Sequence, residues 1–562
     1  MTRIVSVFLI SFVLIGLVAC GGGSSTPPPT PTPTLPVSPS SANVIIGGSQ
    51  TFSIPGATSI TWSLTGPGSI DSQKGVYLAP ATFPGTGQNT ATITGTTPSG
   101  TGVATAVVVY ANTHQSFQSG LIKFGTSGGN VDDVDNSPPP KGGCCIGTLG
   151  SLWSRGAGTF ILSNNHVLDE SSFGTAGQAI NQPGPALCFG TSNKTVANLT
   201  QGAKLKPTAG DDPTGCAQST APFCGKSPSN TDAAIAAVAP GEVDVTGSIL
   251  DLGPAGPTSI ADAPPSATLF TGIPTPGQQV AKSGRTSALT CSTIQGISAD
   301  IFVDYESSCN GPKAFSATFN NQIVVNGANF IQAGDSGSLL VTADTARPMG
   351  LLFATGLNGA VANPIQDVIA ALTDPGPPAA APQIVGGADH PVSCAPTQSI
   401  ASAQVGIGSA STLTPQQRAA VSSVRDRYAK ALMSDRAVRS VDVGASADSP
   451  GDGALVINLR GTPATSIPAT LDGVRTRVVY AGTPPQLTKA QLLSTIAVKQ
   501  AHRDAVMSQR GVQGIAVGRS DDNPAEPAIL IYTIKGVPHD PIPATIDGVR
   551  TKIMEGGRFE AK

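Results

Sequence analysis

The sequence predicts a multidomain protein built mainly from β-strands. At 562 residues the chain is too long for a single hydrophobic core, so several folding units are expected. Glycine (66) and proline (48) are plentiful, whereas charged residues make up only 12% of the chain and aromatic residues 4%. This composition favours short strands and many turns over long, salt-bridged helices. The formal net charge of −3 shows no basic excess, so nucleic acid is not an expected partner.

The first 20 residues have the pattern of an export signal. Arg3 precedes an apolar run at residues 4–19, which is shorter than the roughly 20 residues that span a bilayer and fits a signal-peptide core. The run ends in Leu-Val-Ala-Cys, which resembles a bacterial lipobox and implies that Cys20 is lipidated. We therefore expect a lipoprotein of the bacterial cell envelope, anchored at the outer membrane on its periplasmic or exposed side. A plain secretory signal is the alternative.

Two segments follow the signal. Residues 21–38 are a proline-rich stretch, which predicts an extended spacer. Residues 39–112 alternate apolar and polar residues in short runs, which predicts a small β-sandwich. The motifs PSSANVIIGGSQTF, TWSL and KGVYLAPAT resemble bacterial Ig-like domains of the group 2 kind. That resemblance implies a spacer domain or, alternatively, a module that binds a surface.

Cysteines mark the middle of the chain as a cross-linked unit. The chain has nine cysteines; leaving out Cys20, the other eight lie between residues 144 and 394. An even number of cysteines in an exported chain predicts disulfides, and short spacing favours the pairs Cys216–Cys224 and Cys291–Cys309. A zinc site is the alternative, but the chain has no Cys-x-x-Cys motif, so we expect no metal. No organic cofactor is expected either.

The C-terminal part contains an internal repeat after a linker at residues 396–412. Residue 413 corresponds to 487 and residue 467 to 542, a period of 74 to 75 residues that defines copies at 413–482 and 487–562. Each copy is predicted to form a helix, two short strands and a further strand, and the copies are expected to pack as a pair. They contain no catalytic constellation, and one hypothesis makes them an intramolecular regulator of the preceding domain.

Three residues between 113 and 395 have the types that a serine hydrolase needs. His166 follows an apolar strand, Asp232 precedes another, and Ser336 lies in Gly-Asp-Ser-Gly. A serine hydroxyl needs a neighbouring base, and the base needs a carboxylate to orient it. Taken singly, each residue has a structural interpretation: a structural histidine, a turn or capping aspartate and a serine in a glycine turn. The order His, Asp, Ser favours a catalytic triad.

The motifs around these residues resemble a chymotrypsin-fold, trypsin-like serine peptidase. The resemblance covers residues 140–375, and its matching stretches are, in order, SNNHVL, VAKSGRTSALTCSTIQG, GDSGS and PMGLLFATG. The resemblance implies a double β-barrel in which Ser336 attacks the peptide carbonyl. His166 would transfer the proton and Asp232 would orient the imidazole.

The same resemblance assigns supporting roles to neighbouring residues. The backbone N–H groups of Gly334 and Ser336 would form the oxyanion hole, and Asp335 would pair with Arg285. The second histidine of this region, His114, lies in a segment with the composition of a linker. We therefore expect a lipid-anchored serine endopeptidase acting on protein or peptide substrates. The alternative is a cell-surface binding lipoprotein whose protease-like domain is silent or cuts only itself.

Overall fold

The computed structural model describes the chain from residue 34 to residue 561 with internal gaps. The described ranges are 34–81, 84, 88–109, 113–133, 146–184, 193–208, 230–306, 313–327, 330–356, 359–394 and 413–561. Strands predominate in these ranges, so the mainly β prediction is confirmed. Cys20, Cys216, Cys224 and Cys309 lie outside the described residues. Within those ranges, no helix is long and apolar enough to cross a membrane.

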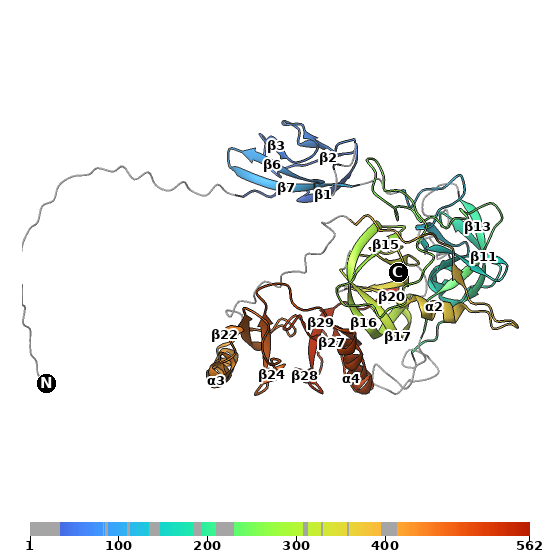
Figure 1. Ribbon diagram of the computed structural model, residues 1–562. Coiled ribbons are helices and arrows are strands. Elements are labelled where there is room, and N and C mark those ends of the chain that lie inside the picture. The colour runs from blue at the N-terminus through green and yellow to red at the C-terminus, as the bar shows by residue number, and fades with distance from the viewer. Residues whose placement is uncertain are drawn as a thin grey trace, which may run out of the picture.

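The first unit consists of two small sheets around a shared apolar core, drawn in blue in Figure 1. Its strands are β1 (Ser41–Ile45), β2 (Ser49–Thr51), β3 (Thr61–Thr65), β4 (Ser69–Ile70), β5 (Val76–Leu78), β6 (Thr90–Thr97) and β7 (Gly100–Val109). One sheet has the order β1-β7-β6-β3 and the other β2-β5-β4. Trp62 and Tyr77 are both buried between them, because apolar residues alternate with exposed polar ones along the strands.

The second unit begins with a curled sheet of order β21-β10-β11-β14-β13-β12-β8-β9. Its elements are β8 (Thr126–Asn130), β9 (Gly147–Leu149), β10 (Ser151–Arg155), β11 (Gly158–Ser163), α1 (Asn165–Leu168), η1 (Glu170–Ser172), β12 (Ala179–Gln182), β13 (Lys194–Gly202), β14 (Ala234–Val238) and β21 (Gln383–Ile384). Strand β9 lies at one end of this sheet and β10 lies next to the other end, yet only Gly150 separates them in the sequence. The sheet must therefore curl round so that its two ends come close together. A Cβ on Gly150 would lie 2.0 Å from the Gly337 carbonyl oxygen, which places this bend directly against the loop that carries Ser336.

A second curled sheet follows, with the order β15-β18-β19-β20-β17-β16 and an additional β15–β16 pairing that joins its two ends. Its elements are β15 (Gln279–Gly284), β16 (Ala288–Glu306), β17 (Lys313–Asn326), β18 (Leu339–Thr342), β19 (Pro348–Gly356), β20 (Gly359–Pro364) and α2 (Ile365–Leu372). The two curled sheets lie side by side (Figure 1), an arrangement compatible with the expected double barrel.

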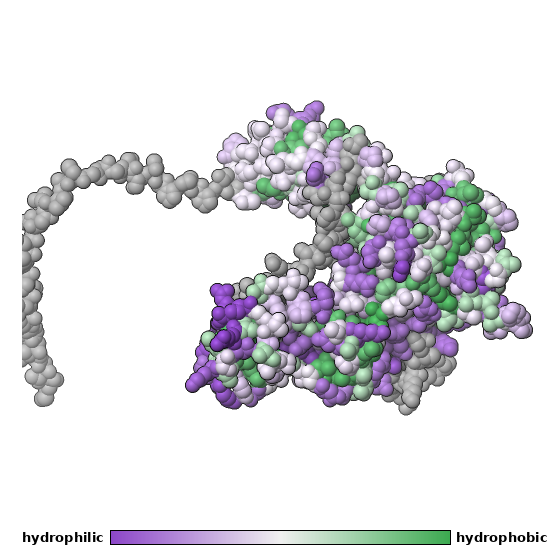
Figure 2. Space-filling model, in the orientation of Figure 1, coloured by the Kyte–Doolittle hydropathy of each residue, from purple (hydrophilic) through white to green (hydrophobic). Residues whose placement is uncertain are grey.

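The two repeats have the same element order and the same strand pairing. The first contains α3 (Pro415–Leu432), β22 (Val438–Ala445), β23 (Gly453–Leu459), β24 (Thr470–Leu471) and β25 (Val474–Val479). The second contains α4 (Lys489–Met507), β26 (Val512–Arg519), β27 (Pro527–Ile534), β28 (Thr545–Ile546) and β29 (Val549–Gly556), followed by β30 (Glu560–Ala561). Each helix begins with a Thr–Gln capping box, at Thr414 and Thr488. The exposed face of α3 is mostly charged or polar and forms the hydrophilic area over α3 in Figure 2.

The repeats contact each other through reciprocal hydrogen bonds. Arg475 donates to the carbonyl and hydroxyl oxygens of Thr551, and Arg550 donates to the same two atoms of Thr476. These residues are 75 positions apart in the two copies, so the interface has an internal two-fold character. The two repeats therefore contact each other directly through equivalent residues.

The second repeat also continues the second curled sheet. Strand β26 pairs antiparallel with β16, so β26, β27, β29 and β28 extend the sheet beyond β16 (Figure 1). Lys499 of α4 makes a 2.5 Å ion pair with Asp300 of β16, and both side chains are almost completely buried. Tyr532 donates to Gln295 of β16 at 2.9 Å. The second repeat is thus built into this sheet.

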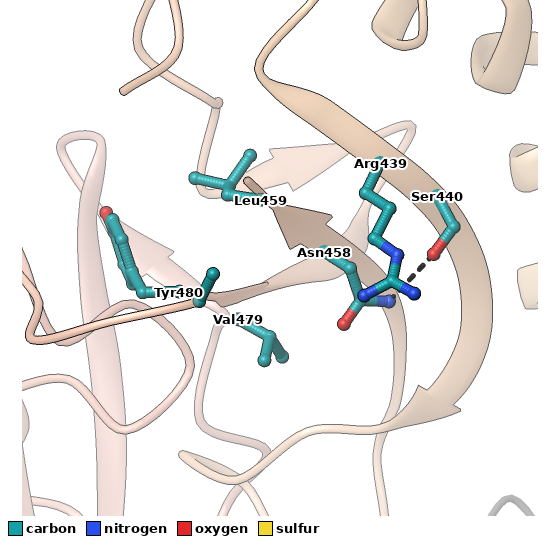
Figure 3. Close-up of a pocket in the computed structure, with 7 residues that line it drawn as sticks. Arg439, Ser440, Asn458, Leu459, Val479 and Tyr480 are labelled. Carbon is teal, nitrogen blue, oxygen red and sulfur yellow. Dashed lines mark hydrogen bonds between the residues drawn. The ribbon is translucent and has the colours of Figure 1, made fainter. Parts of the chain in front are cut away.

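The face of the first repeat that corresponds to the Tyr532 face of the second repeat is hollowed. It carries a hollow of about 380 Å³, shown in Figure 3, lined by Arg439, Ser440, Asn458, Leu459, Val479, Tyr480 and Ala481. Asn458 occupies the position that the buried Tyr532 has in the second repeat, 74 residues later. A small polar side chain in place of a large apolar one leaves this face unsuited to covering a core.

Candidate active site

Strand pairing in the first curled sheet brings the predicted histidine and aspartate together. His166 lies in α1, which begins directly after β11. Strand β11 pairs antiparallel with β14, with Ser163 opposite Ala234. Asp232 comes just before β14, so its side chain reaches the histidine that follows the neighbouring strand.

The carboxylate of Asp232 is fully buried and accepts three hydrogen bonds. His166 Nδ1 lies 2.6 Å from Oδ2, and the His166 backbone N–H donates to Oδ1 at 3.2 Å. The Tyr305 hydroxyl donates to Oδ2 at 2.7 Å. Because an ionised carboxylate only accepts, Nδ1 must carry a proton, which leaves the Nε2 lone pair available as a base.

Tyr305 is a site residue that sequence reasoning missed. It is fully buried at the end of β16, and burial, followed by the negative charge of Asp232, raises its pKa well above the ordinary value. The hydroxyl therefore stays protonated and remains a donor to the carboxylate. Its ring lies edge-on to the His166 ring with centroids 6.2 Å apart.

Two asparagines fix the backbone of Asp232. Asn164 donates to the Asp232 carbonyl at 2.7 Å. Asn363 of β20 donates to the same carbonyl at 3.2 Å and accepts from the Asp232 N–H at 3.2 Å. The aspartate is thereby held between the first curled sheet, which contains its own strand, and a strand of the second.

Ser336 lies in a tight turn that is tied to the first curled sheet. Gly334 (φ +92°) and Gly337 (φ +95°) both have left-handed backbone conformations, and a Cβ on either would meet a neighbour at 2.3 Å or less. Only glycine fits both positions without strain. Thr148 of β9 donates its N–H to the Ser336 carbonyl at 2.7 Å and its hydroxyl to the Gly334 carbonyl at 2.9 Å.

The serine and the histidine border the same aromatic cluster without a mutual hydrogen bond. Ser336 Oγ donates to the Phe353 carbonyl at 3.3 Å, and the Phe353 ring lies 4.6 Å from that of Phe319. Phe319 in turn stacks on Tyr305, the partner of His166 and Asp232. Within the described ranges, His166 Nε2 is buried and has no hydrogen-bond partner. In enzymes, the hydrogen bond between a serine nucleophile and its histidine base is often long or poorly aligned until substrate binds.

Asp335 forms its ion pair with Lys282, which corrects the prediction that it pairs with Arg285. Lys282 Nζ lies 3.1 Å from Asp335 Oδ2, and both side chains are fully buried. Lys282 sits in β15 and points inward, whereas Arg285 follows the strand and donates to Ser127 Oγ at 3.3 Å. The charge of Asp335 still acts on Arg285 and opposes the lowering of the Arg285 pKa by burial.

Hydrogen bonds complete the surroundings of Asp335. It accepts from the N–H groups of Thr286 at 2.8 Å, Ser287 at 3.1 Å and Gln332 at 2.9 Å. Burial favours the neutral acid, but the charge of Lys282 and these hydrogen bonds outweigh it, so the pKa of Asp335 lies below its usual value. An ionised carboxylate therefore holds the loop next to Ser336 in shape.

The disulfide prediction at Cys291 was wrong. Cys291 bonds to Cys394, 103 residues away, with their Cα atoms 5.7 Å apart. The short-spacing argument failed because β16 runs on in an extended conformation from Cys291 to Glu306, up to about 50 Å of strand, and so leads the chain away from Cys291.

Two further predictions concern histidine and metal. His114, expected in a linker, is fully buried and bonds Asp251 Oδ2 through Nε2 at 2.8 Å. Among the residues that the structure describes, no three His, Cys, Asp or Glu side chains gather as a metal site would require.

Comparison with known proteins gives distant structural neighbours among solved structures. No protein-family model and no curated protein matches the chain. A crystal structure of a chymotrypsin from Cellulomonas bogoriensis is similar. The match has a TM-score of 0.25 and 14% sequence identity, and it covers 44% of this chain and 94% of the chymotrypsin.

Proposed function

We propose that this chain is a serine endopeptidase that uses His166, Asp232 and Ser336. The observation that carries the proposal is the buried Asp232 carboxylate bonded to His166 Nδ1 and to Tyr305, with the glycine-flanked Ser336 beside the same aromatic cluster. A buried carboxylate that fixes a histidine tautomer is the arrangement that activates a serine hydroxyl.

In this mechanism Ser336 Oγ turns from the Phe353 carbonyl to His166 Nε2 by a change of side-chain rotamer. It then attacks the substrate carbonyl carbon while Nε2 takes its proton. Asp232 and the Tyr305 hydroxyl stabilise the imidazolium that forms. The N–H groups of Gly334 and Ser336 receive the developing oxyanion, and each such donor lowers the barrier by about 3 kcal/mol. His166 returns the proton to the leaving amine, and water then releases the acyl group by the same steps.

The proposal includes the cell envelope as the place of action. The lipobox-like Leu-Val-Ala-Cys ending at Cys20 and the proline-rich residues 21–38 would tether the catalytic unit to a membrane at a distance. Peptides or proteins outside the cytoplasm would then be the substrates. The bond between Cys291 and Cys394 supports an oxidising compartment.

The test is active-site labelling of the soluble chain that begins after Cys20. A fluorophosphonate probe is added to the wild type, to Ser336→Ala and to His166→Ala, and intact mass is measured. We expect one adduct on the wild type only. Adduct formation on Ser336→Ala would place the reactive group elsewhere.

A silent, binding-only protein is the second candidate function. It is favoured by the buried His166 Nε2, which has no hydrogen-bond partner among the residues that the structure describes, and by the hydrogen bond that Ser336 Oγ donates to the Phe353 carbonyl. A folded, oxidised chain that takes no label at neutral pH would support it.

A further inference from the structure

The last residues of the chain form a strand on the edge of β19. Strand β30 pairs antiparallel with β19, with Ala354 opposite Ala561 and Thr355 opposite Glu560. On its other side it bridges to β16, where Asp304 pairs with Glu560 and the Asp304 N–H donates to the Phe559 carbonyl at 2.9 Å. The C-terminal segment is thus an added strand between two elements of the second curled sheet.

This strand runs toward Ser336. As the residue number rises from Glu560 to Ala561, the partner on β19 falls from Thr355 to Ala354. The next residue of β19 in that direction is Phe353, whose carbonyl accepts the hydrogen bond from Ser336 Oγ. At about 3.3 Å per residue, strand β30 points at the nucleophile from about one or two residues away.

The side chains of Phe559 and Ala561 are buried at defined positions against the second curled sheet. Phe559 is 2% exposed and packs edge-on against Tyr532 with centroids 5.4 Å apart. Gly356 makes room for it, since a Cβ there would lie 3.0 Å from the Phe559 ring. Ala561 is also buried and belongs to the apolar cluster that contains Tyr305 and Phe353.

We propose that segment 558–561 is a resident, peptide-like ligand that occupies the subsite along the β19 edge beside Ser336 and so inhibits the proposed active site. The inference rests on the proposed function. It names the peptides that compete best with this segment: extended peptides that pair with Ala354 and Thr355, with an aromatic side chain in the position of Phe559 and a small one in that of Ala561. Adding a strand to a sheet edge is a general way to bind peptides through their backbone.

The tethering of the segment has a consequence for activity. Arg558 is fixed to Asp304 by a 3.3 Å ion pair, and Gln513 of β26 donates to the Gly557 carbonyl at 2.7 Å. A short tether of this kind gives an effective concentration in the millimolar range. Substrate peptides must therefore displace the segment, and the full chain cleaves them slowly.

The test compares the full chain with a chain that ends at Gly557. Both are assayed with the fluorophosphonate probe and with fluorogenic extended peptides. We expect peptide cleavage to rise at least 10-fold in the shortened chain. The peptide Gly-Arg-Phe-Glu-Ala-Lys, which is the sequence of residues 557–562, should inhibit the shortened chain competitively, and the reversed sequence should not.

Two measurements guard against a folding defect in the shortened chain. Its unfolding midpoint is compared with that of the full chain. In the intact full chain, amide hydrogen exchange is recorded with and without a peptide aldehyde that binds Ser336. We expect residues 558–561 to lose protection when the aldehyde is bound, and unchanged protection overturns the proposal.

The outcomes separate the two proposals. Labelling of both chains with equal peptide cleavage and no inhibition overturns the subsite while the serine peptidase stands. Absence of labelling in both chains overturns the peptidase. In that case, binding of the fluorescently tagged hexapeptide to the shortened chain still decides the subsite: specific binding supports it, and binding equal to that of the reversed peptide overturns it.

Discussion

Replacing Lys282 by methionine should strongly destabilise the unit formed by the two curled sheets. Lys282 Nζ and Asp335 Oδ2 are 3.1 Å apart and both side chains have no exposed surface. At an effective dielectric constant of about 20, two unit charges at that distance attract by about 5 kcal/mol. Removing one partner of such a pair leaves a buried, uncompensated charge, which costs about 3–5 kcal/mol. That is a large share of the stability of an ordinary domain.

The assay is urea unfolding followed by the fluorescence of Trp153. The chain has two tryptophans, so a Trp62→Phe background leaves only Trp153, which is buried in the first curled sheet, as reporter. The matched control is Lys123→Met. Lys123 pairs with Asp262 at 2.8 Å but is 41% exposed, so its loss should cost no more than about 1 kcal/mol.

A double variant and a pH series complete the test. Asp335→Asn combined with Lys282→Met should cost less than the sum of the single changes, because no buried charge remains. The pKa of Asp335 is lowered in the folded chain, so the stability that it contributes is present above about pH 4 and is lost as the pH falls. The deficit of Lys282→Met should therefore shrink in acid. Equal effects of the Lys282 and Lys123 changes, or strict additivity in the double variant, would refute the reasoning.

Three further changes test other parts of the molecule. Tyr305→Phe removes the donor to Asp232, and since such a bond is worth about 1.5–3 kcal/mol, fluorophosphonate labelling should slow about 10- to 100-fold; an unchanged rate would contradict the role of the hydroxyl. Burial and the neighbouring Asp522 carboxylate raise the pKa of Asp448 to about 6, so the folded chain should lose stability as the pH rises from 4 through 6. Urea unfolding of Asp448→Asn at pH 4.5 and 7.5 should lack that loss. Cys394→Ser opens a loop of 103 residues and should cost about 4–5 kcal/mol, and non-reducing peptide mapping of the wild type should find Cys291 joined to Cys394 and not to Cys309.

Local sequence patterns predicted the elements that carry the site but not their partners. The sequence pattern put His166 after one apolar strand and Asp232 before another, and the two residues meet because these strands are adjacent in the sheet. Tyr305 lies 73 residues from Asp232 and reaches it only through the fold of β16, so no spacing rule could have found it. Lys282 was missed for a different reason: strand geometry decides which basic side chain of the motif points inward.

The disulfide shows the same limit at longer range. Short spacing is a guide only where the chain turns back between two cysteines. Here Cys291 lies at the beginning of a long strand, while Cys394 returns to it after the whole second sheet has been completed. The closure of that sheet through the β15–β16 pairing is a property of register that the sequence pattern does not contain.

The repeats show how similar sequences acquire different environments. The period of 74 to 75 residues predicted two equivalent modules, and their elements and mutual contacts are equivalent. Their outer faces differ because Tyr532 and Lys499 of the second copy are replaced by Asn458 and Arg425 in the first. Tyr532 and Lys499 bond to β16, whereas Arg425 pairs with the exposed Asp426 on its own helix. The second copy is therefore the one fitted to the second curled sheet.

This attachment bears on the hypothesis that the repeats are a removable regulator. A cut in the 396–412 linker would sever one covalent connection, but β26 would remain hydrogen-bonded to β16 and β30 to β19. The ion pair between Lys499 and Asp300 is buried, and separating two charges in a buried environment is costly. Regulation that depends on release of the whole module would thus require unfolding of the shared sheet. Displacement of segment 558–561 alone requires only the exchange of one short strand for another, which is the lower-cost route to an open β19 edge.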